Sequence, residues 1–233
     1  MTREATRLRR TLCACALLVG TSVHAQFGAG VGVESDYRFR GVSLSNGQPD
    51  VRLSVSYDHD SGAFAGAAAT GVEFMHGHRS VQLLGYAGFV ARASRELSAE
   101  FGVTGSTFSG NTRYDYVEAF AGLSGERWSL RAYYSPDYFG FGQASAYVEL
   151  DANAPLMARW RVFAHVGGLA ALGNRGSDDR RRVRTDARVG FGVGVAESVD
   201  LQLAWVGASG GGPYVVEYGT PRNSVVLSLL ASF

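Results

Sequence analysis

Apolar and polar side chains alternate residue by residue over short segments of this chain. Between residues 27 and 40 the odd positions carry Phe, Ala, Val, Val, Ser, Tyr and Phe, while the even positions carry three glycines followed by Glu, Asp, Arg and Arg. Because successive side chains of a β-strand point to opposite faces, this pattern predicts a strand with one apolar face and one small or charged face. A strand of that kind separates two different environments.

The alternation recurs along the chain and predicts 12 strands. In residues 81–92 and 114–123 Leu and Tyr fall on both faces, so the pattern leaves open which face of these two strands is apolar. Residues 157–167 alternate less cleanly and fit best with Trp160, Val162 and Ala164 facing outward and Arg159, Arg161 and His165 facing inward. The expected strands are residues 27–40, 51–57, 64–74, 81–92, 97–107, 114–123, 127–135, 143–152, 157–167, 183–195, 199–207 and 224–233.

The connections between these segments alternate in length. Short turns are expected near residues 59–62, 93–96, 124–126, 153–156 and 196–198, and longer loops near 41–49, 75–80, 109–113, 136–142, 168–182 and 209–222. Outer-membrane barrels combine short periplasmic turns, longer external loops and an even number of strands. The sequence therefore predicts an all-β fold, a transmembrane antiparallel up-and-down β-barrel of about 12 strands, with both ends of the barrel domain on the periplasmic side.

The last predicted strand carries a second indication of a barrel. Counting back from Phe233, every second residue is apolar: Ala231, Leu229, Leu227 and Val225. A terminal Phe on such a face resembles the signal that the barrel-insertion machinery reads on outer-membrane proteins, so that machinery is an expected partner. We expect this strand to pair with residues 27–40, which would leave no open sheet edge in the hydrocarbon.

The first 25 residues have the features of a secretory signal peptide. A basic stretch with four arginines precedes an apolar run at residues 12–20, and Val23-His24-Ala25 predicts cleavage before Gln26. The apolar run is shorter than the roughly 20 residues of a membrane-spanning helix. Cys13 and Cys15 lie inside this run rather than at its end, which disfavours a lipoprotein. We expect residues 1–25 to be removed and residues 26–233 to form one barrel domain in the outer membrane of a Gram-negative bacterium.

The composition agrees with strands rather than membrane helices. The chain has 31 Gly, 11 Tyr and 13 Phe, and its 46% of hydrophobic residues form no long apolar run. Without residues 1–25 it carries 18 arginines and 20 carboxylates, a balance that gives no reason to expect a nucleic-acid partner. Aromatic residues near the strand ends are expected to form girdles against the outer-membrane lipid: Phe27, Tyr57, Phe74, Phe108, Trp128, Tyr134, Trp160 and Phe233.

The charged residues of the alternating segments are expected to face the lumen. Mixed Arg and carboxylate rows favour a narrow channel for passive diffusion of small polar or charged solutes. In the alternative interpretation these rows pair and close the interior, because a barrel of about 12 strands has a narrow lumen; the protein would then be a structural or surface-binding barrel acting through residues 168–182 and 209–222. The predicted pore-lining residues are Glu34, Asp36, Arg38, Arg40, Arg52, Glu100, Arg131, Glu149, Arg161, Arg184, Asp186 and Arg188.

Catalytic and metal-binding interpretations receive less support from the sequence. A lipid-modifying enzyme would pair a histidine with a nucleophile, but His59 falls in a turn and only His165 falls on a strand, where it faces the lumen beside Arg161. The segment His76-Gly77-His78 near Glu73 is a weak metal motif. We therefore expect no enzymatic activity, no catalytic residues, no cofactor and no metal site.

Residues 35–43, Ser-Asp-Tyr-Arg-Phe-Arg-Gly-Val-Ser, resemble the opening signature of the proteobacterial TorF family of porins. As in members of that family, a short polar stretch with a proline follows, here Asn46-Gly47-Gln48-Pro49, and then a strand, a turn and a strand over residues 51–69. The strand that begins at residues 114–118 and the final apolar strand are also similar in kind. The resemblance implies an outer-membrane barrel with a channel function, and it carries over no substrate and no catalytic residue.

Overall fold

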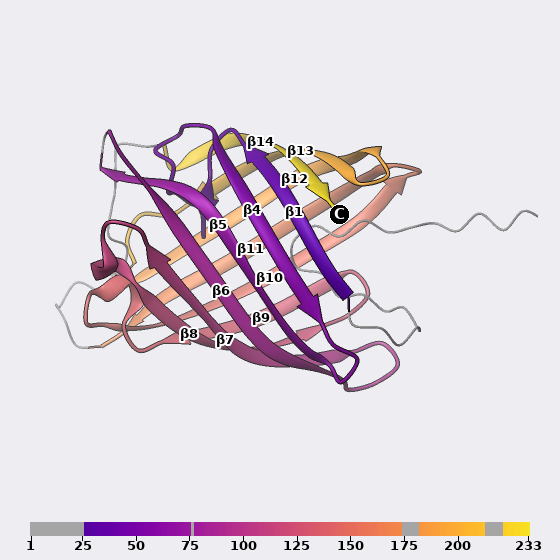
Figure 1. Cartoon of the computed structure of the whole chain (residues 1–233), viewed down its shortest axis with the longest axis horizontal. Helices are drawn as coiled ribbons and strands as arrows, with labels where there is room; N and C mark the ends of the chain where they lie inside the picture. Colours follow the sequence, from indigo (N-terminus) through magenta and orange to yellow (C-terminus); the bar gives the residue numbers. More distant parts are fainter. Residues whose placement is uncertain (1–25, 76, 174–181, 213–220) are drawn as a thin grey trace, which may run out of the picture.

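The structure, a computed structural model, describes residues 26–75, 77–173, 182–212 and 221–233. In this part of the chain 12 strands form one closed antiparallel barrel, as the sequence predicts (Figure 1). No helix of the described residues is long and apolar enough to cross a membrane. The barrel strands are β1 (Gln26–Glu34), β4 (Asp50–Asp58), β5 (Ala63–Met75), β6 (His78–Arg92), β7 (Ser98–Phe108), β8 (Tyr116–Ser124), β9 (Trp128–Ser135), β10 (Ala144–Met157), β11 (Trp160–Leu172), β12 (Val183–Ala196), β13 (Val199–Ala208) and β14 (Asn223–Ser232).

The first and last barrel strands close the sheet. Strand β1 pairs with β14, with Val31 opposite Ala231. The backbone N–H of Phe233 donates to the carbonyl of Ala29 at 2.9 Å, and the N–H of Ala29 donates to the carbonyl of Phe233 at 3.2 Å. The predicted closure is therefore correct, and it leaves the sheet without an unpaired edge.

The two faces of the barrel wall differ as the alternation predicts. Large apolar side chains point outward and are half-exposed, for example Leu53 at 54%, Val103 at 52% and Leu203 at 50%. The structure also settles the two strands whose faces the sequence left open. In β6 Val81 is exposed and Gln82 is buried, and in β8 the residue before Glu118 is exposed while Glu118 is buried.

The predicted first strand, residues 27–40, is too long. Strand β1 ends at Glu34, and the chain then forms a two-stranded hairpin of β2 (Arg38–Phe39) and β3 (Val42–Ser43). Asp36, Arg38 and Arg40 are therefore not on the barrel wall. The prediction failed because a small hairpin keeps the period-two alternation of a longer strand. The positive φ angles of Arg40 (49°) and Gly41 (76°) create the turn.

Two predicted connections are also wrong. Met75 pairs with His78, so β5 and β6 join in a tight turn and not in a loop over residues 75–80. Asn153 pairs with Phe163, so the predicted turn at 153–156 is part of β10, which continues past a bulge at Pro155. Part of a third connection is wrong as well, because residues 168–172 of the loop expected at 168–182 belong to β11. The loops expected at 168–182 and 209–222 otherwise lie partly outside the described residues, and the signal peptide lies wholly outside them.

Phe108 does not belong to the expected aromatic girdle. It occupies the inward face of β7, is fully buried, and stacks on Phe139 with ring centroids 5.6 Å apart. Phe139 belongs to the short 3₁₀ helix η2 (Tyr138–Gly140); a second one, η1 (Thr112–Tyr114), follows β7. Trp128, Trp160 and Phe233 are exposed on the wall, as expected of girdle residues. The buried core of this barrel thus lies inside the lumen.

Candidate functional site inside the barrel

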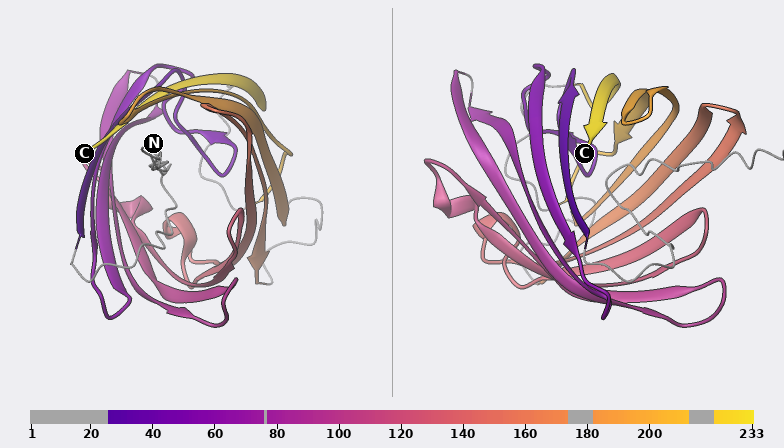
Figure 2. Two further views of the ribbon diagram at one scale, coloured as in Figure 1. Left: turned by 90° about the vertical axis from the view of Figure 1, so that its right-hand side faces the viewer. Right: turned by 45° about the vertical axis from the view of Figure 1, so that its right-hand side comes forward.

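Residues 35–49, between β1 and β4, fold into the barrel at the end where the longer connections lie. Figure 2 (left), in which the wall forms a ring, shows this segment inside the ring together with the loop that carries η2. The Asp36 carboxylate organises the segment, since it accepts hydrogen bonds from Arg38 Nε at 2.6 Å and Ser43 Oγ at 2.6 Å. The hairpin of β2 and β3 is therefore held by its own polar side chains.

The hairpin is also attached to the wall. Buried Tyr37 donates its hydroxyl to Gln82 Oε1 on β6 at 3.0 Å. Burial raises the pKa of Tyr37 to about 12, so its phenol stays neutral and available as a donor. The tip of the hairpin lies against the opposite part of the wall, where a Cβ on Gly41 would come within 2.7 Å of Asp186 Cβ and 2.8 Å of Ala208 Cβ. The segment therefore extends across the lumen.

Arg40 lies at the centre of this end of the barrel. Its guanidinium donates to both carboxylate oxygens of Glu118, at 2.9 and 2.8 Å, and its Cζ lies 4.0 Å from the ring centroid of Tyr147 and 5.1 Å from that of Tyr133. Burial disfavours the charged guanidinium and acts to lower the pKa of Arg40. Its neighbours Tyr138 and Glu118 together raise the pKa by more than burial lowers it, so the pKa of Arg40 is well above its ordinary value. The guanidinium stays charged inside an aromatic cage.

A buried hydrophobic cluster surrounds Arg40. Its members come from the segment of residues 35–49, from η2 and from the inward face of the wall, and they pack together inside the lumen. They are Tyr37, Val42, Leu44, Val72, Phe108, Tyr116, Tyr138, Phe139, Tyr147 and Leu169. This cluster therefore lies in the path through the barrel.

Toward the other end, charged residues of the wall pair across intervening glycines. Arg131 of β9 donates to Glu100 of β7 at 2.5 and 3.3 Å, although β8 lies between the two strands. The pair passes over Gly122 of β8, where a Cβ would come within 2.9 Å of both Arg131 Cγ and Glu100 Oε1. The same arrangement recurs between Arg161 and Asp200, which bond at 2.6 and 2.5 Å over Gly192.

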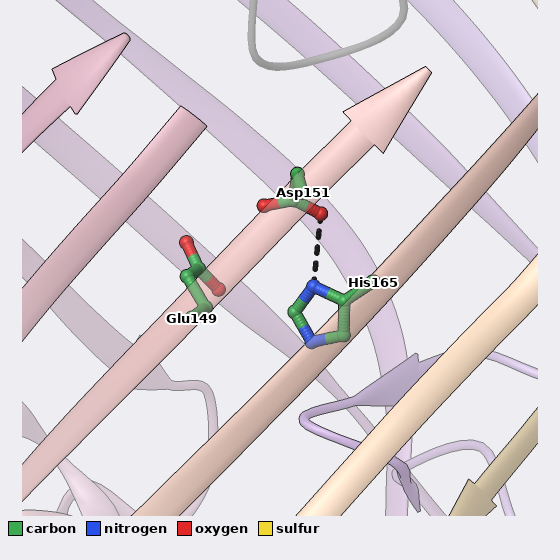
Figure 3. A group of neighbouring side chains, drawn as sticks. All are labelled: Glu149, Asp151 and His165. Atoms are coloured by element: carbon green, nitrogen blue, oxygen red, sulfur yellow. Dashed lines mark hydrogen bonds and ion pairs between the residues drawn. The ribbon is translucent and has the colours of Figure 1, made fainter. Parts of the chain in front are cut away.

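His165 of β11 forms a third polar group in the middle of the wall. Its Nδ1 lies 2.8 Å from Asp151 Oδ1, and its Nε2 lies 2.9 Å from Asp186 Oδ1 and 3.1 Å from the Tyr147 hydroxyl. Figure 3 shows the Asp151 carboxylate facing one ring nitrogen, with Glu149 beside it on the same strand. Glu149 accepts a hydrogen bond from the Tyr133 hydroxyl at 2.9 Å.

The remaining predicted pore-lining residues have varied surroundings. Glu34 accepts a hydrogen bond from Ser228 Oγ at 3.2 Å, and Arg52 is half-buried opposite Gly32. Arg184 is buried, and its Nε donates to the carbonyl of Gly211 at 2.6 Å. Arg188 donates to Gln202 Oε1 at 3.2 Å. All of the 12 predicted residues are at least partly buried. Some of them pair with each other, as Arg131 does with Glu100, and others bond to groups that the sequence did not single out, as Arg40 does to Glu118.

Sequence reasoning missed Glu118, Tyr133, Tyr147 and Asp151. Glu118 was missed because the face of its strand was undecided. Asp151 follows Glu149 at the same period as the other inward residues, so extending that pattern by one step would have included it. Nothing in the sequence indicates the aromatic cage, because Arg40 belongs to the segment after β1 and lies far in the chain from Tyr133 and Tyr147.

A family model described as "Bacterial protein of unknown function (Gcw_chp)" matches residues 19–233. No curated protein matches the sequence. Among solved structures the fold is similar to that of the KdgM porin, at 10% identity and a TM-score of 0.56 over 88% of this chain and 98% of that one. It is also similar to the NanC porin, at 11% identity and a TM-score of 0.56 over 89% and 99%, and to the KdgM porin in complex with disordered oligogalacturonate, at 10% and 0.54 over 90% and 98%. At these identities the likeness concerns the fold alone.

Proposed function

The chain belongs to the Gcw_chp family of bacterial proteins of unknown function, and we propose that it is an outer-membrane channel for passive diffusion of small polar or charged solutes. The observation that carries the proposal is a closed barrel with an apolar outer face and a charged inner face. The outer face carries many half-exposed Leu, Val and Phe side chains, and a surface so rich in apolar groups fits a hydrocarbon environment better than water. A closed barrel also satisfies every backbone group that the wall would place in lipid.

The charged inner face supports a polar route through the barrel. Arg161 and Asp151 keep 24% and 38% of their side chains accessible, so water reaches the lumen below the hydrophobic cluster. Solutes with hydroxyl, carboxylate or ammonium groups can exchange hydrogen bonds with such a wall. We propose that the 12 residues predicted to line the pore do so, with Glu118, Asp151 and Asp200 adding carboxylates to that surface.

The hairpin and its cluster support a narrow channel rather than a wide one. Residues 35–49 occupy the lumen where Arg40 contacts Glu118 and Tyr147. A solute would have to pass beside this constriction. The channel would therefore admit only small molecules, or it would conduct only when the hairpin moves.

A second candidate function follows from the same hairpin. The buried cluster around Phe108, Tyr138 and Phe139 is packed like a protein core, which favours a permanently closed barrel with a structural or surface-binding role. This candidate and the channel differ in one measurable property, the conductance of a single folded molecule.

The test is single-channel recording of the folded protein in planar bilayers. We expect discrete conductance steps, and a larger step for Arg40→Ala, because that variant releases the hairpin from Glu118. Arg92→Ala, an exposed residue at the end of β6, is the matched control and should keep the wild-type step. Silent bilayers for folded wild-type protein and for Arg40→Ala would support the closed barrel instead.

The comparisons and the histidine agree with a transport role. The KdgM porin has been captured with oligogalacturonate, a polar and charged solute, which supports this solute class for a barrel of the same fold. Within the described residues His165 contacts two carboxylates and a phenol, and no serine or threonine hydroxyl. We therefore propose no enzymatic activity.

Membership of the TorF family, cleavage before Gln26 and recognition of the last strand by the insertion machinery remain predictions.

A further inference from the structure

Three potential metal ligands converge on the inner wall between β10 and β11. Glu149 and Asp151 are two residues apart on β10, so their side chains share a face, and Asp151 is paired with His165 of β11. One ligand atom from each of the three residues lies within 4.8 Å of the other two. Figure 3 shows the Asp151 carboxylate at Nδ1 of the ring and the Glu149 carboxylate beside it.

The charge around these residues is unbalanced. Glu149, Asp151 and Asp186 bring three carboxylates to one imidazole. Arg131 lies opposite Glu149 in the register of β9 and β10 but is bonded to Glu100, and Arg40, whose charge also acts on Glu149, is bonded to Glu118. In the described part of the chain Glu149 therefore has a phenol as its hydrogen-bond partner and no ion pair. A half-buried carboxylate of this kind favours an additional cation.

We propose that Glu149, Asp151 and His165 form a binding site for a divalent transition-metal cation such as Zn²⁺. One imidazole nitrogen and two carboxylate oxygens suit the borderline first-row ions better than Mg²⁺ or Ca²⁺, which prefer oxygen alone. The site lies on the wall below the hydrophobic cluster, where Asp151 is accessible to water and hence to a metal ion.

The neighbouring residues have the arrangement that supports metal ligands. Asp186 faces Nε2 of His165 and can accept its N–H, which leaves Nδ1 for the ion. Carboxylates in this position fix the orientation of a ligating imidazole. The Tyr133 hydroxyl does the same for Glu149 by donating to one of its oxygens. The competing interpretation is that His165 only bridges two aspartates as an imidazolium and binds no metal.

The test measures metal binding in detergent, without a membrane, and so does not depend on the proposed channel. The untagged chain is folded in micelles with Cys13 and Cys15 alkylated, and Zn²⁺ binding is followed by calorimetry and by equilibrium dialysis. We expect one saturable equivalent that depends on His165, and Co²⁺ should give visible absorption bands from the same site. Glu149→Gln and His165→Ala should each weaken binding by about tenfold or more, and Asp186→Asn by roughly tenfold.

Two exposed histidines provide matched controls. His59→Ala, in the turn after β4, and His78→Ala, at the start of β6, remove a histidine away from the cluster and should leave the binding constant unchanged. Circular dichroism confirms that each variant is folded. Wild-type protein that binds no Zn²⁺ would overturn the proposal, as would binding that persists unchanged in His165→Ala. Equal competition by Mg²⁺ or Ca²⁺ would overturn the assigned class of metal.

Discussion

The Arg40 guanidinium and the Glu118 carboxylate, 78 residues apart in the chain, form a buried two-bond ion pair inside the barrel. Arg40 comes from a hairpin that follows the first strand, and Glu118 comes from the wall at β8. The pair joins the hairpin to the far side of the lumen.

Removing one member of this pair should destabilise the protein. Arg40→Ala leaves the Glu118 carboxylate buried without its cation, and we expect a loss of about 3–5 kcal/mol in the free energy of unfolding. Urea unfolding in detergent, followed by tryptophan fluorescence, measures the change. The double variant Arg40→Ala/Glu118→Ala should be less destabilised than the sum of the two single variants. An Arg40→Ala protein as stable as wild type would show that the hairpin does not depend on the pair.

A glycine on the inner wall should be needed for the group around His165. A Cβ on Gly167 would come within 2.0 Å of the Tyr147 hydroxyl and 2.8 Å of Asp186 Oδ2. We expect Gly167→Ala to lower the free energy of unfolding by about 1–3 kcal/mol. The next residue, Gly168, has no atom within 4 Å of the corresponding position. Gly168→Ala is therefore the control, and equal thermal stability of the two variants would contradict the prediction.

A charge on the outer face should show whether the wall contacts hydrocarbon. Leu203 is half-exposed in the middle of β13, and Leu203→Arg should cost about 2–4 kcal/mol in lipid bilayers. Val183 is the first residue of β12. Val183→Arg should cost at most about 1 kcal/mol, because this position lies near the expected interface between membrane and water. Unfolding titrations in liposomes measure both values. If the two substitutions cost the same, the wall does not span a bilayer in the proposed orientation.

Phe233 should matter for assembly in the cell more than for the folded barrel. Its backbone pairs with Ala29, but its side chain is 77% exposed. We expect Phe233→Ala to fold in detergent with nearly wild-type stability, and to accumulate at a much lower level in outer membranes because the terminal recognition residue is lost. Membrane fractionation with an immunoblot measures that level. Phe27, an exposed residue near the N-terminal end of the barrel domain, provides the control variant Phe27→Ala. An equal decrease in the membrane level of both variants would argue against recognition of the terminal Phe.

The sequence by itself determined the barrel. The period-two alternation is a local property of each strand, and it predicted 12 strands, the outward faces of most of them and the closure of the first strand on the last. It also placed Glu100, Arg131, Arg161 and Asp186 on the inner face, since facing depends only on the parity of the position within a strand.

Only the tertiary structure decided what fills the interior. Alternation does not distinguish a strand that continues along the wall from a hairpin that turns inward, so Asp36, Arg38 and Arg40 were assigned to the wrong element. The partners of the inward charges depend on the stagger between strands and on glycines such as Gly122, which let side chains meet across an intervening strand. These distances arise when the barrel closes, because closure brings residues from many strands to one lumen, and no local pattern records them.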